Sequence, residues 1–342
     1  MISISQRRRK MATIKDVAKK AGLSVSTVSR FLNDHPYISD DKKERIQQAM
    51  DELNYAPSAI ATQLRSKKCT TIGVLISRIT NPFFSYLVDA IEKQAKEHGY
   101  QLLIMQTYDD PKAELKMLEY LKQQVVAGVI MTSVESDSQV IERYSTYGPI
   151  VLCNEQLEGT GIPNISTNQE EISYEATNYL IQKGYRKIAY CTGGNLTIGG
   201  HGQRRTKGFE RALAEHNLPI KNKWIFKQVH NMKDGQKVAK ELLALPKKER
   251  PDAVFSGSDE VGIGIIQEVL QQGLRVPEDL AVLGFDNQPS TSIIAVPLTT
   301  INQPTTALGI EATKLIVALI EGRTYQVNKK ELILSLIERK ST

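Results

Sequence analysis

Apolar residues in the first fifth of the chain recur three and four positions apart, which is the spacing of one helix face. Three short stripes follow this rule: Ile14, Val17, Ala18 and Ala21; then Val28, Phe31 and Leu32; then Ile46, Ala49, Met50 and Leu53. Thr13, Ser24 and Ser39 precede the stripes and are suited to cap helices. Gly22 permits the backbone to turn after the first stripe. The pattern predicts three short helices around one miniature core.

From residue 70 the pattern changes to short β-rich runs that alternate with helical periods. The predicted strands cover 71–77, 100–107, 128–133, 187–193, 252–258 and 280–286, and the predicted helices cover 82–98, 111–124, 204–217 and a segment ending at 271. Such alternation predicts parallel sheets with helices on both faces. We expect two α/β lobes, with a ligand cleft between them at the carboxyl ends of the strands. The fold class is therefore α + α/β.

These patterns divide the chain into a basic leader (1–12), a helical head (13–56), a linker (57–69) and a two-lobed core (70–342). In the linker, Pro57 and the potential cap Ser58 start a helical segment that is too short to be stable alone in water. We expect the linker to be disordered until something supports it, and the leader, with RRRK at 7–10, to be disordered as well.

The basic charge of the chain is concentrated in its first fifth. The whole chain carries a net charge of +6, whereas residues 1–69 contain 14 Lys and Arg against 7 Asp and Glu, which leaves the remainder near neutrality. A basic segment that also predicts a helix-turn-helix points to DNA as its partner. The small residues of the second helix let it enter the major groove, where Ser26 and Arg30 can reach base edges. An ordinary αα-hairpin is the structural alternative, and the basic excess favours DNA binding.

Several other classes of protein lack support in the sequence. No segment has the roughly 18 consecutive apolar residues of a membrane span, and the basic start is not followed by the apolar region of a secretory signal, so we expect a cytoplasmic protein with no membrane partner. Cys69, Cys153 and Cys191 are far apart and the five His are scattered, which argues against disulfides and metal sites. The phosphate-binding, nucleotide-binding and nucleophile-elbow patterns are missing, so we expect neither a cofactor nor enzymatic activity.

Two long segments resemble the DNA-binding head of the LacI/GalR family of bacterial transcriptional regulators. They are TIKDVAKKAGLSVSTVSRFLN (13–33) and ISDDKKERIQQAMDELNYAPSAIATQLRSKK (38–68). The resemblance implies a homodimer that binds a pseudo-palindromic DNA operator, as a repressor, because two symmetric heads read two half-sites.

The same resemblance implies a role for individual residues of the head and linker. The base-reading positions are Val25, Ser26 and Arg30, and Arg30 can present a bidentate fork to guanine. The positions that contact the DNA backbone are Ser24, Thr27, Ser29, Asn33, Tyr37 and Ser39. The linker becomes a hinge helix in the minor groove, at Ser58, Ala61 and Leu64, with Leu64 as the wedge that opens a base step.

The core resembles the periplasmic-binding-protein-like domain of that family along its whole length, for example at RRTKGFERAL (204–213) and VPEDLAVLGFDN (276–287). The implied effector is a sugar or sugar phosphate, with purines or nucleosides as the less favoured alternative, bound by Phe83, Phe84, Arg205, Asp259 and Asp286. Arg205 supplies a planar fork for hydroxyls, carboxylates or phosphates. Helix or turn capping is the structural alternative for the two Asp residues, and core packing is the alternative for the two Phe residues.

Three functional alternatives remain at this point. Within the family, a catabolite-control regulator would be activated by a phosphorylated phosphocarrier protein. An enzyme acting on a sugar or nucleoside in the cleft is more distant, because the catalytic patterns are missing. A transport receptor is more distant still, because the chain has a DNA-binding head.

Overall fold

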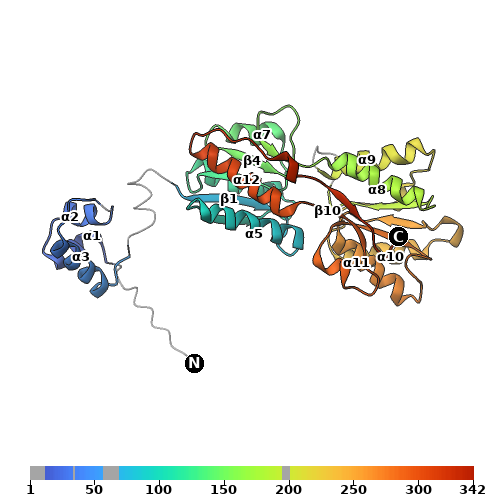
Figure 1. Ribbon diagram of the computed structural model, residues 1–342, viewed down its shortest axis with the longest axis horizontal. Coiled ribbons are helices and arrows are strands. Elements are labelled where there is room, and N and C mark those ends of the chain that lie inside the picture. Colours follow the sequence, from blue (N-terminus) through green and yellow to red (C-terminus); the bar gives the residue numbers. More distant parts are fainter. Residues whose placement is uncertain (1–11, 34, 57–68, 195–200) are drawn as a thin grey trace, which may run out of the picture. The chain divides into compact units, whose positions relative to one another are not determined.

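The computed structural model describes residues 12–33, 35–56, 69–194 and 201–342. The chain divides into two compact units, with the boundary between Cys69 and Thr70. The first unit contains the helical head, and the second contains both α/β lobes (Figure 1). The linker residues Ser58, Ala61 and Leu64 lie outside the described residues.

The head consists of α1 (Ile14–Ala21), α2 (Val25–Phe31) and α3 (Asp40–Glu52). Thr13 and Asp16 form a reciprocal capping box at the start of α1, and Gly22 takes a left-handed conformation (φ 66°) that turns the chain toward α2. The three predicted stripes meet in one small core, whose buried members are Val17, Ala18, Ala21, Val28, Ile46 and Ala49. The predicted three-helix arrangement is therefore confirmed.

The first lobe contains a five-stranded parallel sheet in the order β2-β1-β3-β4-β5. Its strands are β1 (Thr71–Ile76), β2 (Gln101–Gln106), β3 (Gly128–Met131), β4 (Ile150–Cys153) and β5 (Asn164–Ile165). Its connecting helices are α5 (Pro82–Glu97), α6 (Pro111–Lys122) and α7 (Ser138–Tyr144). One apolar cluster contains side chains of α5 and another contains side chains of α6 and α7, so the sheet is buried on both faces.

The second lobe contains a six-stranded sheet in the order β11-β10-β9-β8-β6-β7, parallel except for the pair β10 and β11. Its strands are β6 (Ile188–Cys191), β7 (Ile225–Phe226), β8 (Ala253–Phe255), β9 (Ala281–Asp286), β10 (Thr299–Asn302) and β11 (Ser335–Ile337). Its helices are α8 (Gln169–Gln182), α9 (His201–Glu215), α10 (Met232–Ala244) and α11 (Asp259–Gln271). Helices α8 and α9 share one apolar cluster, and α10 and α11 share another.

The chain passes between the lobes three times. It leaves the first lobe between β5 and α8, returns between β10 and α12 (Thr305–Ile320), and crosses again between α12 and β11. Leu308, Ala312 and Ile316 of α12 pack in the same apolar cluster as α5, although α12 follows a second-lobe strand. These three connections join the lobes, and Figure 1 shows the red segment of the chain passing between them.

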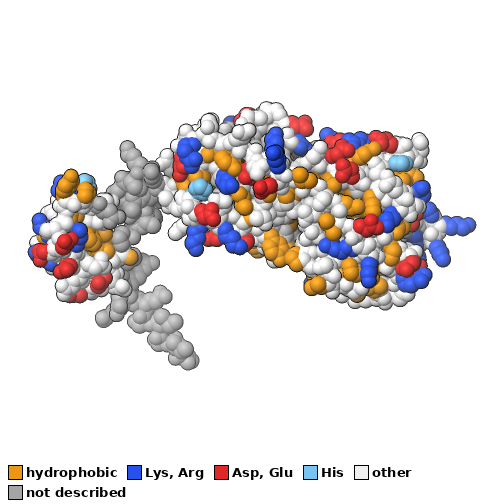
Figure 2. All heavy atoms as spheres, viewed as in Figure 1, with side chains coloured by type: hydrophobic (Ala, Val, Ile, Leu, Met, Phe, Trp, Pro, Cys, Tyr) orange, Lys and Arg blue, Asp and Glu red, His pale blue; other side chains and the backbone are white. Residues whose placement is uncertain are grey.

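Charged side chains of both signs are interspersed over the face of the core that Figure 2 shows. That face offers no broad basic surface of the kind that duplex DNA requires. Among the described residues, no helix is long and apolar enough to cross a membrane.

The packing of α8 against α9 requires a glycine at position 208. A Cβ atom there would lie 2.1 Å from the carbonyl oxygen of Glu170 and 2.9 Å from the amide nitrogen of Tyr174, and both of these are backbone atoms of α8. We predict that Gly208→Ala lowers the free energy of unfolding by about 1–3 kcal/mol or more, because the two helices must separate. Urea titration followed by fluorescence of Trp224, the one tryptophan of the chain, measures this loss in the second lobe.

Gly161→Ala is the matched control, because a Cβ atom there meets nothing within 4 Å and the position needs no left-handed backbone. Equal stability of the two variants would contradict the close approach of α8 and α9.

Candidate DNA-binding surface and ligand cleft

Helix α2 turns its polar side away from the core of the head. Val28 is fully buried, whereas Val25 is 41% exposed and Ser26 and Arg30 are also exposed. The three residues predicted to read bases therefore share the outward side of a helix that is held by its one buried valine and by the packing of Phe31. This is the arrangement that a helix needs to enter the major groove.

Three of the six residues predicted to contact the DNA backbone, Ser24, Thr27 and Asn33, bond within the head, and the Thr27 hydroxyl lies 2.8 Å from the Ser24 hydroxyl. Ser24 and Asn33 have local structural roles, since the Ser24 hydroxyl accepts the amide of Thr27 at 3.1 Å and the Asn33 amide donates to the carbonyl of Ser29 at 2.6 Å. Tyr37 is 93% exposed and Ser39 makes no side-chain capping bond, so both remain available to a phosphate.

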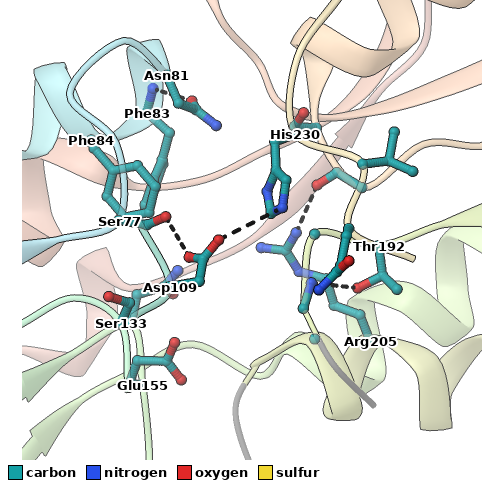
Figure 3. A pocket seen from close by; sticks show the side chains of 18 of the residues that line it. Ser77, Asn81, Phe83, Phe84, Asp109, Ser133, Glu155, Thr192, Arg205 and His230 are labelled. Atoms are coloured by element: carbon teal, nitrogen blue, oxygen red, sulfur yellow. Dashed lines mark hydrogen bonds and ion pairs between the residues drawn. The ribbon is translucent and has the colours of Figure 1, made fainter. Parts of the chain in front are cut away.

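A cleft of about 220 Å³ lies between the two lobes of the core (Figure 3). Its first-lobe wall is formed by residues that follow β1, β2, β3 and β4, and its second-lobe wall by residues that follow β6 and β8, the end of β9 and the start of α9. The cleft therefore lies at the carboxyl ends of both sheets, as the sequence predicts, and its size suits a small molecule.

Arg205 is the buried cation of this cleft, with 8% of its surface exposed. Its Nε donates to Oε1 of Gln169 at 2.7 Å, and one terminal nitrogen donates to the carbonyl of Gly257 at 3.0 Å. The guanidinium lies over the ring of Phe285, 3.5 Å from the centroid. The other terminal nitrogen makes no hydrogen bond within the described part of the chain, so it can donate to a ligand. Burial lowers the pKa of Arg205, while the negative charge of Asp286 opposes that change.

Gln169 connects Arg205 to the segments that cross between the lobes. It is the first residue of α8, directly after the first crossing, and its amide nitrogen lies 3.1 Å from side-chain oxygens of both Asn154 and Gln303. Gln303 lies in the second crossing and donates to Asp286 at 2.7 Å. A ligand that moves Arg205 or Asp286 therefore acts directly on two of the three connections.

Asp286 and Asp259 occupy different environments, although the sequence predicts both as ligand contacts. Asp286 lines the cleft. Its φ of 114° is one that residues other than glycine rarely adopt, so the backbone at the end of β9 is constrained. Asp259 is fully buried and does not line the cleft. Its carboxylate accepts the amide of Gln288 at 2.7 Å and the hydroxyl of Thr300 at 2.5 Å.

Asp259 therefore joins α11 to the segments after β9 and in β10, and we do not carry it into the ligand site. Burial, followed by the negative charge of Asp286, raises the pKa of Asp259 well above its usual range. The structural alternative given from the sequence was helix or turn capping; Ser258 caps α11, and Asp259 instead accepts the backbone amide of Gln288.

Phe83 and Phe84 both line the cleft, near the start of α5. Phe83 is also a buried member of the first-lobe core, and Phe84 packs against that core from the outside. Their rings meet edge to face, with centroids 5.2 Å apart. Phe84 thus has the larger surface to offer a ligand, while Phe83 combines the core and lining roles.

Sequence reasoning did not identify the carboxylates of the first-lobe wall, which are Asp109, Glu135 and Glu155. Each of them follows a strand, and two follow strands that the sequence predicts, so the rule that ligands bind at carboxyl strand ends could have identified them. Asp109 accepts the Ser77 hydroxyl at 2.7 Å and forms an ion pair with Arg78. Glu135 has a pKa raised to about 8, first because of burial and then because of neighbouring carboxylates.

His230 faces this wall from the second lobe, with its Nε2 3.6 Å from the Asp109 carboxylate (Figure 3). Burial, followed by the positive charge of Arg78, lowers the pKa of His230, so the imidazole is neutral at pH 7. The pair therefore joins the lobes as a weak polar contact rather than as a full ion pair.

Comparison with known proteins gives the same division into head and core. The family model described as "Bacterial regulatory proteins, lacI family" matches residues 13–58, and "Periplasmic binding proteins and sugar binding domain of LacI family" matches residues 69–337. The NTD biosynthesis operon regulator NtdR of Bacillus subtilis is 37% identical over 334 residues, which are 97% of this chain and 100% of NtdR.

Two solved structures extend the comparison. A LacI family transcriptional regulator from Lactobacillus casei, solved with bound sucrose, is 39% identical and has a TM-score of 0.75 over 80% of this chain and 99% of its own. The Lac repressor dimer bound to operator and the anti-inducer ONPF is 26% identical and has a TM-score of 0.79 over 97% of this chain and 99% of its own.

The relative and the two solved structures named above are transcriptional regulators, and the family match argues against the enzyme as a function of this chain. The chain belongs to the LacI family of bacterial regulatory proteins and is a DNA-binding transcriptional regulator.

Proposed function

We propose that this protein is a repressor that binds a pseudo-palindromic operator as a homodimer and is controlled by a small, sugar-like molecule in the interlobe cleft. The observation that carries the proposal is the presence, on one chain, of an outward helix with exposed Ser26 and Arg30 and of a cleft whose buried Arg205 has a donor to spare. The operator-bound Lac repressor dimer and the sucrose-bound Lactobacillus casei regulator support the two halves of the proposal by similarity.

The effector would act by holding the lobes at one angle. Arg205 and Asp286 bind it from the second lobe while Phe84 packs on it from the first, and the Gln169 and Gln303 contacts transmit the change to the crossings. In a dimer, a new angle between the lobes alters the spacing of the two linkers, and so favours or disfavours hinge-helix formation on DNA. Such coupling is typically worth about 1–3 kcal/mol.

A phosphorylated phosphocarrier protein is the alternative controlling partner that the sequence leaves open. Within the described part of the chain, no contact or charge pattern favours such a partner. The small molecule is therefore the control that we propose.

Arg30 tests base reading. A pseudo-palindromic duplex selected from a randomised pool and a scrambled duplex of equal length can be titrated by fluorescence anisotropy at fixed salt. We predict that Arg30→Ala loses about 1–3 kcal/mol of affinity for the selected duplex, because a bidentate contact to guanine is lost, and changes the scrambled duplex much less.

Arg30→Lys is the matched control, since it keeps the charge and removes the planar fork. It should bind the scrambled duplex like the unsubstituted protein and still discriminate poorly. If Arg30→Ala weakens both duplexes equally, the residue contacts phosphate and the base-reading assignment is wrong.

Leu64 tests the hinge. We predict that Leu64→Ala weakens operator binding at least tenfold and leaves ligand affinity in the cleft unchanged, because a wedge in the minor groove acts only on DNA. Anisotropy and calorimetry on the same preparation measure the two affinities. A parallel loss of both would place Leu64 in the fold of the core instead of at the DNA.

A further inference from the structure

The first-lobe wall of the cleft carries three carboxylates at one edge of the sheet. Asp109 follows β2, Glu135 follows β3 and Glu155 follows β4, and all three line the cleft. Parallel strands bring their carboxyl ends to the same edge, so the sequence positions converge although they are about 20 residues apart. Figure 3 shows Asp109 and Glu155 on this side of the cleft together with Ser133.

The cations near this wall do not neutralise it. Arg78 forms an ion pair with Asp109 only, and Arg205 lies in the other lobe, where Asp286 is the first of its charged neighbours. His230 is neutral at pH 7. No hydrogen bond or ion pair joins the Glu135 carboxyl to another residue within the described part of the chain, although its own backbone amide donates to Glu114 at 2.7 Å. Among the described residues, no cation is therefore paired with the Glu135 carboxyl, although the charge of Arg78 acts on it.

Ser133 gives an independent indication that a polar ligand group belongs here. It lines the cleft, is only 5% exposed, and its hydroxyl has no hydrogen-bond partner among the described residues. A buried hydroxyl without a partner is costly, and native proteins seldom leave one unless a ligand or water completes it. This hydroxyl can accept from, or donate to, a ligand that reaches the acidic wall.

A metal ion does not fit the same position. The described residues contain no group of three His, Cys, Asp or Glu side chains that could hold a metal. Three carboxylates that line a wall without converging on one point are better matched by an organic cation, whose hydrogen-bond donors point in several directions. Arg205 and Asp286, on the opposite wall, supply a donor and an acceptor for hydroxyl groups.

We propose that the ligand of this cleft is a polyhydroxylated amine of the amino-sugar class, with its ammonium group against Glu135, whose carboxyl releases its proton to solvent as the cation binds, and its hydroxyls between Ser133, Arg205 and Asp286. The inference rests on the proposed function in one respect, namely that the cleft is the effector site. It departs from the sequence-based expectation of a sugar phosphate, because a phosphate at this wall would face carboxylates of its own sign.

The Glu135 carboxyl makes the free energy of unfolding depend on pH. Burial and the charges of Asp109, Glu114 and Glu155 raise the folded-state pKa of Glu135 from 4.5 to about 8, and Arg78 opposes this only in part. A raised carboxyl pKa means that folding favours the protonated form, so the stability contribution is present below pH 4.5 and is lost as pH rises through 8.

Between pH 5 and pH 9 the unsubstituted protein should lose the stability that the protonated Glu135 contributes. We predict that Glu135→Gln loses less, so that its free energy of unfolding rises relative to that of the unsubstituted protein as the pH rises from 5 to 9. Urea titrations at both pH values, followed by Trp224 fluorescence, measure the gain. Glu175→Gln, an exposed carboxylate on α8, should show none. Equal pH dependence in all three proteins would mean that Glu135 is neutralised by a group other than a ligand.

Calorimetry with matched sugars tests the ligand class directly. The probes are glucosamine, galactosamine and mannosamine, each compared with its parent hexose and the hexose 6-phosphate, at pH 6.5 and constant ionic strength. We expect at least one amine to bind tenfold or more tightly than its parent hexose, and its phosphate counterpart to bind more weakly than either. Glu135→Gln should reduce the preference for the amine to threefold or less, whereas Glu175→Gln should retain it.

Tighter binding of a neutral or phosphorylated sugar, a preference that survives Glu135→Gln, or no binding of any amine would each overturn the inference. Operator titrations of the same preparations separate this failure from that of the proposed function. A protein that binds its operator and responds to a neutral sugar keeps the function and loses only the amine.

Discussion

The hydrogen bond between Arg205 and Gln169 is the contact on which the control that we propose for the core depends. A buried guanidinium is costly unless its donors are paired, and here Gln169, the Gly257 carbonyl and the face of Phe285 compensate for most of that cost. Because Gln169 also reaches Gln303, the same cation is tied to two interlobe crossings. The one donor left over faces the cleft, so ligand binding and lobe geometry involve the same side chain.

The head follows a different constraint, which is size. Among the described residues its apolar cluster has six buried members, and every apolar stripe contributes to it. The capping box of Thr13 and Asp16, the left-handed Gly22 and the Ser24 cap fix the helix ends, and the Ser24 hydroxyl also lies 2.8 Å from the hydroxyl of the outward Ser26. That economy leaves Val25, Ser26 and Arg30 exposed, which is the condition for reading bases.

Much of this architecture could be predicted from the chain, because caps and apolar spacing are local properties. The head helices and the alternating strands and helices of the core appear close to their expected bounds. Strand β8 is shorter than expected, since Gly257 and Ser258 leave the sheet to line the cleft and Ser258 caps α11. The return of α12 to the first lobe was not predictable, because its apolar residues find their partners on α5, some 220 positions away.

The candidate site was predictable where one residue carries a distinct chemistry, and less so where the environment decides the role. Arg205, Phe84 and Asp286 line the cleft, and their contact with an effector stays a prediction. Asp259 follows a strand in the same way as Asp286, yet the amide of Gln288 and the hydroxyl of Thr300 occupy its carboxylate. The wall of Asp109, Glu135 and Glu155 was not predicted, because these residues are far apart in the sequence and come together only where the carboxyl ends of separate strands meet.

The central claim is that ligand binding in the cleft and operator binding at the head are linked by a coupling free energy. Calorimetry measures it most directly, by comparing the affinity for the tightest cleft ligand with and without saturating operator duplex. The account predicts that the two affinities differ by a factor of about 5–150, and that the ligand changes operator affinity by the same factor. An unchanged ligand affinity in the presence of operator would contradict the coupling.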